Sequence, residues 1–311
     1  MFKQIKFLRS NNPPGTSFMR YTAARAGAAP AKIRDWWSLD RIDPVFACAV
    51  VKSEDFCFSK HYGVAWEATL FATIAALRRK NEIKGVSTIT QQLARNLFLT
   101  PERKISRKLR EIVYAIAMDR SLGKQRVLEL YLNTVEWAEG VWGCAAATQH
   151  YLGKNPDQLS PFEGIVLSSL LPAPRRALTG ANLERACAVQ NRVAWQLYLS
   201  GVLEKPEMIE CLSRVTRLRE LLAQGRSLTG AFLAERTPFA PPMDSVLVPL
   251  TRQKAERLLP EDIVAQEYGI ERERFELIEL RRSLGTEAWR ELVMSGKFFR
   301  LAATDAEPNL T

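Results

Sequence analysis

The stretch RKISRKLREIVYAI, residues 103–116, decides the fold class of this chain. Its apolar residues recur at intervals of three and four, the spacing of one face of an α-helix. These residues are Ile105, Leu109, Ile112, Val113 and Ile116. The pattern predicts a helix with one apolar stripe, while the charged side chains, Glu111 among them, project from its other faces.

Helical spacing recurs further along the chain. The clearest segments are KQRVLELYLN (residues 124–133), GCAAATQHYL (143–152) and SPFEGIVLSSLL (160–171). In the last of these, Ser160 suits a helix cap, Pro161 suits the first turn and Pro172 suits the end. Few runs show the alternation of a β-strand. The sequence therefore predicts a mainly α fold.

Composition divides the chain into three parts. Residues 1–40 are rich in Pro, Gly, Ala and Arg with little periodicity, which predicts a loosely structured N-terminal arm. Residues 41–211 carry dense helical patterns and form the predicted main domain. Residues 212–311 are more polar and hold charged helical segments without a chemical motif, so they are predicted to be a C-terminal extension of unknown role.

The charge of the chain indicates an anionic partner. The 311 residues are 47% hydrophobic, enough for a packed core, and their formal net charge is +10. Ten Lys and Arg between Arg78 and Arg110 face only Glu82 and Glu102. Nucleic acid, phospholipid head groups and phosphorylated small molecules all satisfy such a charge, and a solvated basic helix face explains it as well.

Cysteine usage excludes two classes of site. The five cysteines form no CxxC pair, and the two histidines are too few to complete a zinc site beside them. Neither a metal centre nor a disulfide framework is predicted. The cysteines are expected to be small buried residues.

No membrane-spanning segment or signal peptide is visible in the sequence. Basic residues near the start are not followed by an apolar run, and no segment reaches about 18 consecutive apolar residues. The nearest candidate, residues 64–77, is short and contains Glu67, so it is predicted to be a buried or interfacial helix.

Three polar clusters are candidates for chemistry. SEDFCFSKHYG (residues 53–63) places the pair Glu54 and Asp55 ahead of His61. GVSTITQQLARN (85–96) has Ser and Thr that suit a helix cap beside exposed amides that can seat an anion. The third cluster, residues 103–111, predicts at the least an ordinary helical ion pair between residues 107 and 111, contributing about 0.3–0.5 kcal/mol.

Together the clusters supply what is needed to move a sugar off a diphosphate. One carboxylate can take a proton from an attacking hydroxyl, and a concentration of cations can neutralise the charge that grows on the departing group. Two separated carboxylates, a polar helix start and the basic residues are the required parts.

These clusters resemble a known family, the peptidoglycan glycosyltransferases of family 51. The family includes the glycosyltransferase module of penicillin-binding proteins and the monofunctional biosynthetic transglycosylases. EDFCFSKHYG resembles its ED-x-x-F-x-x-H-x-G motif, GVSTITQQLARN its G-x-STITQQL-x-K-N motif and RKLRE its RK-x-x-E motif. KQRVLELYLN and GVWGCAAATQHYLGK resemble the remaining two, so the likeness covers about residues 42–176.

The resemblance implies a lysozyme-like helical glycosyltransferase fold with a substrate groove between two lobes, followed by a helical C-terminal extension. It implies a hexosyltransferase that polymerises lipid-linked disaccharide-pentapeptide (lipid II) into β-1,4 glycan strands with inversion. Glu54 would be the general base for the 4-hydroxyl of the acceptor sugar. Glu111 would hold the donor diphosphate, either directly or through a divalent cation such as Mg²⁺ or Mn²⁺. No cofactor would be required.

The remaining site residues follow from the same motifs. The resemblance places Ser87, Gln92, Arg95, Arg103, Arg107 and Lys108 at the substrate. Asp55 would support the loop of Glu54, and His61 is expected to be a hydrogen-bonded residue that orients the motif rather than a proton carrier. An apolar wall from Phe56 or Phe58 would raise the pKa of Glu54.

The sequence departs from the family in three respects. Arg95 stands where the family has Lys, Val86 replaces a frequent Gly, and the usual N-terminal anchor is not visible. The expected location is the outer, periplasmic face of the bacterial inner membrane, by peripheral attachment or through another chain. The candidates for the lipid contact are the apolar residues Phe71, Ile74 and Leu77 with the flanking basic residues Arg78, Arg79 and Lys80.

The expected partners are lipid II, the nascent glycan chain, the membrane surface and other cell-wall enzymes. Two rival functions stay open at this point: a lysozyme-like lytic enzyme, which also needs a catalytic glutamate, and a non-catalytic cell-wall interaction module. Nucleic acid is not an expected partner, because no nucleic-acid module accompanies the charge.

Overall fold

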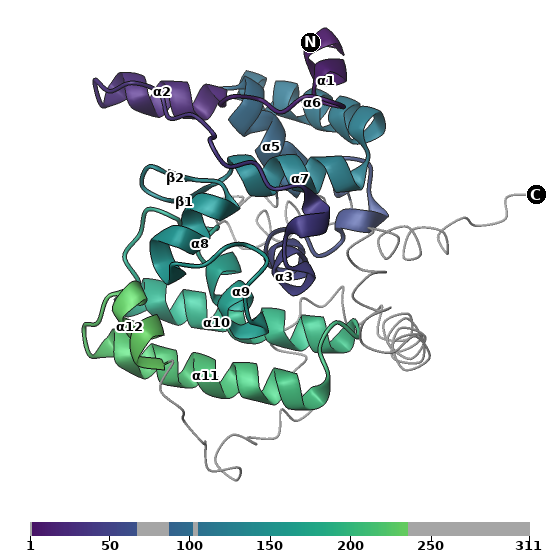
Figure 1. The fold of residues 1–311 in the computed structure, drawn as a ribbon. Helices are drawn as coiled ribbons and strands as arrows, with labels where there is room; N and C mark the ends of the chain where they lie inside the picture. The colour runs from purple at the N-terminus through teal and green to yellow at the C-terminus, as the bar shows by residue number, and fades with distance from the viewer. Residues whose placement is uncertain (1, 67–86, 102–104, 236–311) are drawn as a thin grey trace, which may run out of the picture. The chain divides into compact units, whose positions relative to one another are not determined.

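The computed structural model of this chain describes residues 2–66, 87–101 and 105–235. In chain order its elements are α1 (Phe2–Phe7), α2 (Ser17–Arg25), η1 (Leu39–Arg41), α3 (Pro44–Glu54), η2 (Phe58–Lys60), α5 (Ile89–Phe98), α6 (Ile105–Leu122), α7 (Lys124–Thr134), β1 (Glu136–Ala138), β2 (Val141–Trp142), α8 (Cys144–Leu152), α9 (Pro161–Ser168), α10 (Gly180–Leu199), α11 (Lys205–Ala223) and α12 (Leu228–Glu235) (Figure 1). Helices dominate, which confirms the predicted mainly α class. The predicted helices at residues 124–133, 143–152 and 160–171 correspond to α7, α8 and α9.

The described residues form two compact units, each with its own packing. The first holds residues 2–42, 54–66, 87–101 and 105–147, and the second holds residues 43–53 and 148–235. In the first unit α5 packs against both α6 and α7, α2 packs against α5, and α1 packs against α6 (Figure 1). A short antiparallel hairpin of β1 and β2 follows, pairing Glu136 with Trp142. The largest fully buried side chains of the first unit include Trp137, Tyr131, Ile89, Leu93 and Met118.

Helix α6 confirms the predicted helix but buries a different face. Leu109 and Val113 of the expected apolar stripe are 60% and 52% exposed, whereas Glu111 is only 1% exposed. The buried line runs through Glu111, Ala115 and Met118, at the spacing of one helix face. A buried carboxylate is tolerated where cations bond it, and that condition is met here.

The N-terminal arm contains more structure than its composition predicts. Residues 2–7 and 17–25 are helical, although residues 1–40 were expected to be loosely structured. The hydroxyl of Thr16 caps α2 by accepting from the backbone N–H of Met19 at 3.0 Å. Ile5 and Met19 are buried, so tertiary packing of single apolar residues supplies what the weak periodicity does not show.

The second unit is a helical cluster in which α10 and α11 lie side by side (Figure 1). Helix α9 packs against both, and α12 packs against α11. The Phe162 ring meets Phe232 edge to face at 6.0 Å, and the Arg214 guanidinium lies 4.3 Å from the centre of the same ring. Arg214 also donates to both carboxylate oxygens of Glu235. These contacts tie α12 to α9 and α11.

The cap of α9 and the continuity of α11 test two predictions made from the sequence. Ser160 caps α9 in a reciprocal box with Glu163, and Pro161 occupies the first turn, as predicted; the helix ends at Ser168, ahead of Pro172. The boundary expected after residue 211 falls inside α11, which is continuous. Met208, Cys211, Val215 and Leu218 are buried on one face of α11 at helical spacing, which keeps it whole.

The five cysteines form no disulfide bond with one another. All but Cys57 are buried. Burial raises the pKa of Cys48, Cys144 and Cys211 to about 12. These thiols stay protonated and pack as small apolar residues.

Candidate active site

Glu54 is the last residue of α3 and is half-buried. Gln92 of α5 donates from Nε2 to Glu54 Oε2 at 2.7 Å. Tyr131 of α7 in turn donates its hydroxyl to Gln92 Oε1 at 3.0 Å. Because the amide oxygen is occupied by this donor, the NH₂ group of Gln92 must face Glu54. The orientation of the carboxylate is therefore set by two helices.

Tyr131 is suited to act as a permanent donor. It is fully buried, and burial together with the charge of Glu54 raises its pKa well above the ordinary value of 10.0. The phenol therefore remains protonated across the physiological range. The sequence pattern does not single out Tyr131, because a tyrosine among the apolar residues of a helix is ordinarily a core residue.

Asp55 joins the loop after α3 to the start of α5. Its Oδ2 accepts from the backbone N–H of Ile89 at 3.0 Å, and both carboxylate oxygens lie 3.0 Å from His61 Nε2. Asp55 is buried at the N-terminus of α5, where a negative charge is favourable. Asp55 and His61 thus hold the loop that leaves Glu54.

The start of α5 is fixed by a second set of bonds. Thr88 forms a capping box with Gln91 and donates its hydroxyl to the carbonyl of Gly63 at 2.6 Å. Gly63 has a φ of 81°, and a Cβ built there would lie 2.5 Å from the carbonyl oxygen of Ala115 on α6. Only glycine fits this close approach, which explains why the loop carries one.

Glu111 is the centre of the second carboxylate cluster. Arg107 Nη1 and Lys108 Nζ donate to its two oxygens, each at 2.5 Å. Lys108 Nζ also donates to Ser87 Oγ at 2.9 Å. The predicted pair of residues 107 and 111 is thus present, but its carboxylate is buried and also accepts from a second cation.

A continuous chain of contacts connects the two carboxylates within the first unit. Glu54 accepts from Gln92, and the Gln92 amide lies 3.4 Å from the carbonyl oxygen of Ser87. The hydroxyl of Ser87 accepts from Lys108, which bonds Glu111. Residues far apart in the sequence therefore meet in one polar network.

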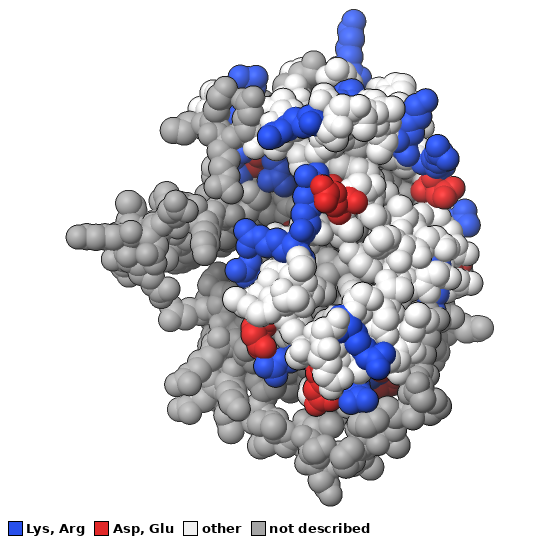
Figure 2. Space-filling model, turned by 90° about the vertical axis from the view of Figure 1, so that its left-hand side faces the viewer, with Lys and Arg blue, Asp and Glu red and all other residues white. Residues whose placement is uncertain are grey.

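Arg95 adds a positive charge on α5 close to this network. It is half-buried, and no carboxylate among the described residues pairs with it. Figure 2 shows one face of the molecule, on which Lys and Arg side chains gather while Asp and Glu are sparser. Arg103, predicted to bind substrate, lies outside the described residues, as do residues 71–80 of the predicted lipid contact.

A buried pair that the sequence did not suggest lies beside the loop of Glu54. Lys124 Nζ is 3.0 Å from Asp119 Oδ2, and it lies 4.6 Å from the centre of the Phe58 ring. Burial raises the pKa of Asp119, although the positive charge of Lys124 acts in the opposite direction. Burial also lowers the pKa of Lys124, although the negative charge of Asp119 acts in the opposite direction. Phe58 therefore packs on Lys124 and on His61, which meets it edge to face at 6.3 Å.

Helix α7 also docks the segment that precedes η1. Glu129 accepts from Trp36 Nε1 at 3.0 Å and from the backbone N–H of Leu39 at 3.2 Å. Asn133 accepts from the N–H of Trp37 and donates to its carbonyl. The polar residues of KQRVLELYLN thus serve packing, and Tyr131 serves the site.

The donor set around Glu111 does not suit a divalent cation. Both carboxylate oxygens already accept from Arg107 and Lys108, so a metal ion would have to displace a like charge. Among the described residues, no group of three or more His, Cys, Asp or Glu side chains is arranged to hold a metal ion. No catalytic step is therefore assigned to a metal.

Comparison with known proteins identifies the relatives of this chain. The family model described as "Transglycosylase" matches residues 22–198. A biosynthetic peptidoglycan transglycosylase of Azoarcus sp. (strain BH72) is 36% identical over 201 residues, covering 63% of this chain and 87% of that protein. Proteins of the same description from Herminiimonas arsenicoxydans and Alcanivorax borkumensis are 40% and 38% identical over 177 and 171 residues. These alignments cover 56% and 55% of this chain, and 77% and 68% of the respective relatives.

Proposed function

This chain belongs to the transglycosylase family, and on that premise we propose that it polymerises lipid-linked disaccharide-pentapeptide into β-1,4 glycan strands. It is a glycosyltransferase of peptidoglycan synthesis by family. The observation that best supports the finer proposal is the contact chain from Glu54 through Gln92, Ser87 and Lys108 to Glu111. It puts a candidate base and candidate diphosphate ligands in one network.

Glu54 is the proposed general base. Its carboxylate would take the proton from the 4-hydroxyl of the acceptor sugar as that oxygen attacks the anomeric carbon of the donor. The bond from that carbon to the lipid diphosphate breaks, and the configuration inverts. The hydrogen bond from Gln92 favours the charged form that a base needs and fixes its direction.

The basic residues are proposed to stabilise the leaving diphosphate. Arg95 has no carboxylate partner in the described part of the chain. The ammonium group of Lys108 donates to the hydroxyl of Ser87 and to the carboxylate of Glu111. Glu111 would act mainly as a positioning residue, because its two oxygens hold Arg107 and Lys108 in place. Fixed cations that face the developing charge lower the barrier without reorganisation during the reaction.

A lipid-linked donor requires contact with a membrane surface, and the proposed location is the outer face of the bacterial inner membrane. None of the described helices is both long and apolar enough to cross a membrane. On α6, Leu109 and Val113 are more than half exposed, and Arg110 between them is also exposed. Apolar residues beside a cation suit an interface that carries anionic lipid.

The membrane proposal is tested by sedimentation with phosphatidylglycerol vesicles. We expect the double variant Leu109→Ser, Val113→Ser to bind vesicles more weakly than wild type. Undiminished binding by this variant would remove α6 from the membrane contact.

The activity is tested with Glu54→Gln, a nearly isosteric change that removes the base. We expect the rate of glycan polymerisation to fall about 10²–10⁴-fold, which is the range contributed by general base catalysis. Purified wild type and variant are incubated with lipid-linked precursor, and the products are separated on a gel. Glu139→Gln, at an exposed site, is the matched control and should polymerise normally. Wild-type turnover by Glu54→Gln would refute the base assignment.

A further inference from the structure

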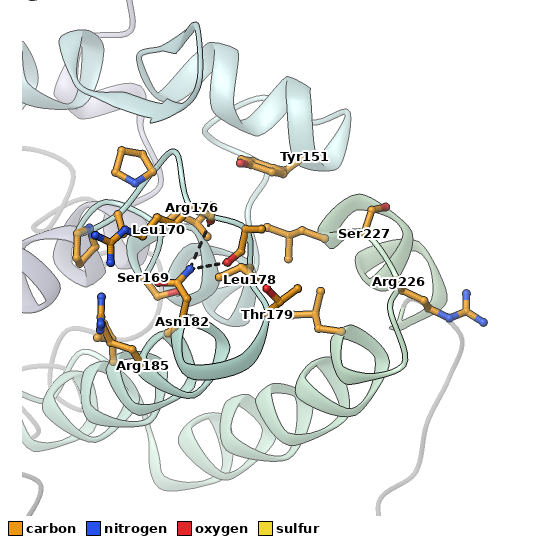
Figure 3. Close-up of a pocket in the computed structure, with 18 of the residues that line it drawn as sticks. Tyr151, Ser169, Leu170, Arg176, Leu178, Thr179, Asn182, Arg185, Arg226 and Ser227 are labelled. Atoms are coloured by element: carbon orange, nitrogen blue, oxygen red, sulfur yellow. Dashed lines mark hydrogen bonds between the residues drawn. The ribbon is translucent and has the colours of Figure 1, made fainter.

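The second unit contains a pocket of about 380 Å³ that the proposed chemistry does not use. It lies where the segment after α9, the start of α10 and the end of α11 come together (Figure 3). Every residue of its lining belongs to the second unit, whereas Glu54, Glu111 and their partners belong to the first. A pocket of this size is in the range that binds small organic ligands.

The charged part of the lining is basic. Arg176, Arg185 and Arg226 line the pocket, and among the described residues no Asp or Glu does. In Figure 3 Arg176 and Arg185 extend to one side of the pocket, while Arg226 points away on the other. No carboxylate in the described part of the chain pairs with Arg176 or Arg185. The nearest acid in sequence, Glu184, accepts from Arg219 instead.

The segment that carries Arg176 is held in place. Asn182 of α10 donates from Nδ2 to the carbonyl of Ala177 at 2.7 Å and to that of Arg176 at 3.4 Å (Figure 3). The backbone of Arg176 is therefore tied to the same helix that carries Arg185. Two like charges that line one pocket without an acid favour an anionic ligand.

The rest of the lining selects what accompanies the anion. Leu170, Leu178, Val189 and Leu222, with two prolines, supply apolar walls. Tyr151, Thr179 and Ser227 also line the pocket, although the Ser227 hydroxyl already accepts from the backbone N–H of Gly230 at 3.1 Å. A simple inorganic anion would leave most of this volume empty, and a bare hydrocarbon chain would offer no hydrogen bond to the hydroxyls of Tyr151 and Thr179.

We propose that this pocket binds a short peptide by its terminal carboxylate, with Arg176 and Arg185 as the anion ligands. Small apolar side chains such as alanine lie against the leucine and proline walls, and the hydroxyls bond the peptide amides. Resting on the proposed function, the peptide would be the stem peptide carried by the disaccharide substrate or by the glycan product. The chain would then hold its polymer at a second point, apart from the sugar-transfer network.

Isothermal titration calorimetry of the full chain tests this inference. The probes are N-acetyl-L-lysyl-D-alanyl-D-alanine, its C-terminal amide, and inorganic phosphate. We expect the peptide acid to bind about tenfold more tightly than the amide, since one charge-assisted hydrogen bond contributes about that factor. Arg176→Gln and Arg185→Gln should each weaken binding of the peptide acid by a similar factor, whereas Arg120→Gln, at an exposed site outside the pocket, should not.

Several results would overturn the inference. These are equal affinity for acid and amide, no binding of either, or unchanged binding by both Arg176→Gln and Arg185→Gln. If inorganic phosphate binds as tightly as the peptide acid, the peptide assignment fails. Thermal melting of each variant confirms that it is folded before it is titrated.

The same experiment separates this inference from the proposed function. Glu54→Gln should bind the peptide acid like wild type while it fails to make glycan. A wild-type protein that polymerises but does not bind the peptide would sink the pocket proposal alone. A protein that binds the peptide but never polymerises lipid-linked precursor would sink the proposed function alone.

Discussion

Substituting Tyr131 by phenylalanine removes one hydroxyl that never touches the substrate in the proposed mechanism. The hydroxyl donates to Gln92 Oε1 at 3.0 Å in a fully buried setting. A net hydrogen bond of this kind contributes about 0.5–1.5 kcal/mol, and a buried acceptor left without its donor costs about 1–3 kcal/mol. We therefore expect Tyr131→Phe to lower the free energy of unfolding by about 1–2 kcal/mol.

The effect on catalysis follows from the freedom that Gln92 gains. Without the phenol, the Gln92 amide can rotate so that its oxygen faces Glu54, where it repels the carboxylate instead of bonding it. A loss of about 1.4 kcal/mol in the transition state is a tenfold loss of rate, so we expect polymerisation to slow about tenfold.

Urea unfolding and the polymerisation assay measure the two effects. Tyr114→Phe is the matched control, because the Tyr114 ring stacks on Phe98 outside the network. In a double-mutant cycle with Gln92→Ala, the rate of the double variant should equal that of Gln92→Ala alone, since the phenol acts through the amide. Fully additive losses of rate, or a Tyr131→Phe variant indistinguishable from wild type, would refute this reasoning.

Three further predictions concern stability and thiol chemistry. Gly63→Ala should cost about 2–5 kcal/mol in urea unfolding, from a positive φ and a backbone clash; Gly153→Ala has a similar φ but open space, so an equal cost would contradict the clash. Burial alone would raise the pKa of Glu163, but the hydrogen bonds from Lys154 and the Ser160 amide outweigh it and lower that pKa below its ordinary 4.5. That contribution is present above pH 4.5 and lost as pH falls through the lower folded value, so the stability deficit of Glu163→Gln should shrink in acid melts, and a constant deficit would count against it. Cys57 alone should react rapidly with a thiol reagent at pH 8, and fast labelling of a second cysteine in the folded protein would contradict the assigned burial.

Helix positions were predictable because they rest on local patterns. The spacing of apolar residues gave α6 and α7, and Ser or Thr before an apolar run gave the caps of α5 and α9. Such signals act within a few residues along the chain, so a sequence displays them directly.

The buried face of α6 was not predictable in the same way. Counting apolar residues selects Leu109 and Val113, yet Glu111 is buried between them and they are exposed. The cause is the set of bonds around this carboxylate. Arg107 and Lys108 of α6 donate to Glu111 and offset the cost of burying its charge, and Lys108 also donates to the hydroxyl of Ser87. This polar network thus overrides the apolar pattern, and the sequence indicated that Glu111 mattered only through its polar cluster and the motif likeness.

The candidate site was named in its parts but not in its connections. Glu54, Gln92 and Lys108 stand in separate motifs, and no spacing rule predicts that they share a network. Tyr131 and the pair of Asp119 and Lys124 were missed, because an aromatic or charged residue in a helical segment ordinarily serves the core or the surface.

The bonds that orient Glu54 come from residues that are synthesised after it. During translation the ribosome delivers Glu54 and Asp55 long before Ile89, Gln92 and Tyr131, on which their placement depends. A nascent chain that stops ahead of α7 would therefore display the acidic pair without a fixed direction for its carboxylate. The carboxylate of Glu54 acquires its fixed direction only when α7, one of the later helices, has been made.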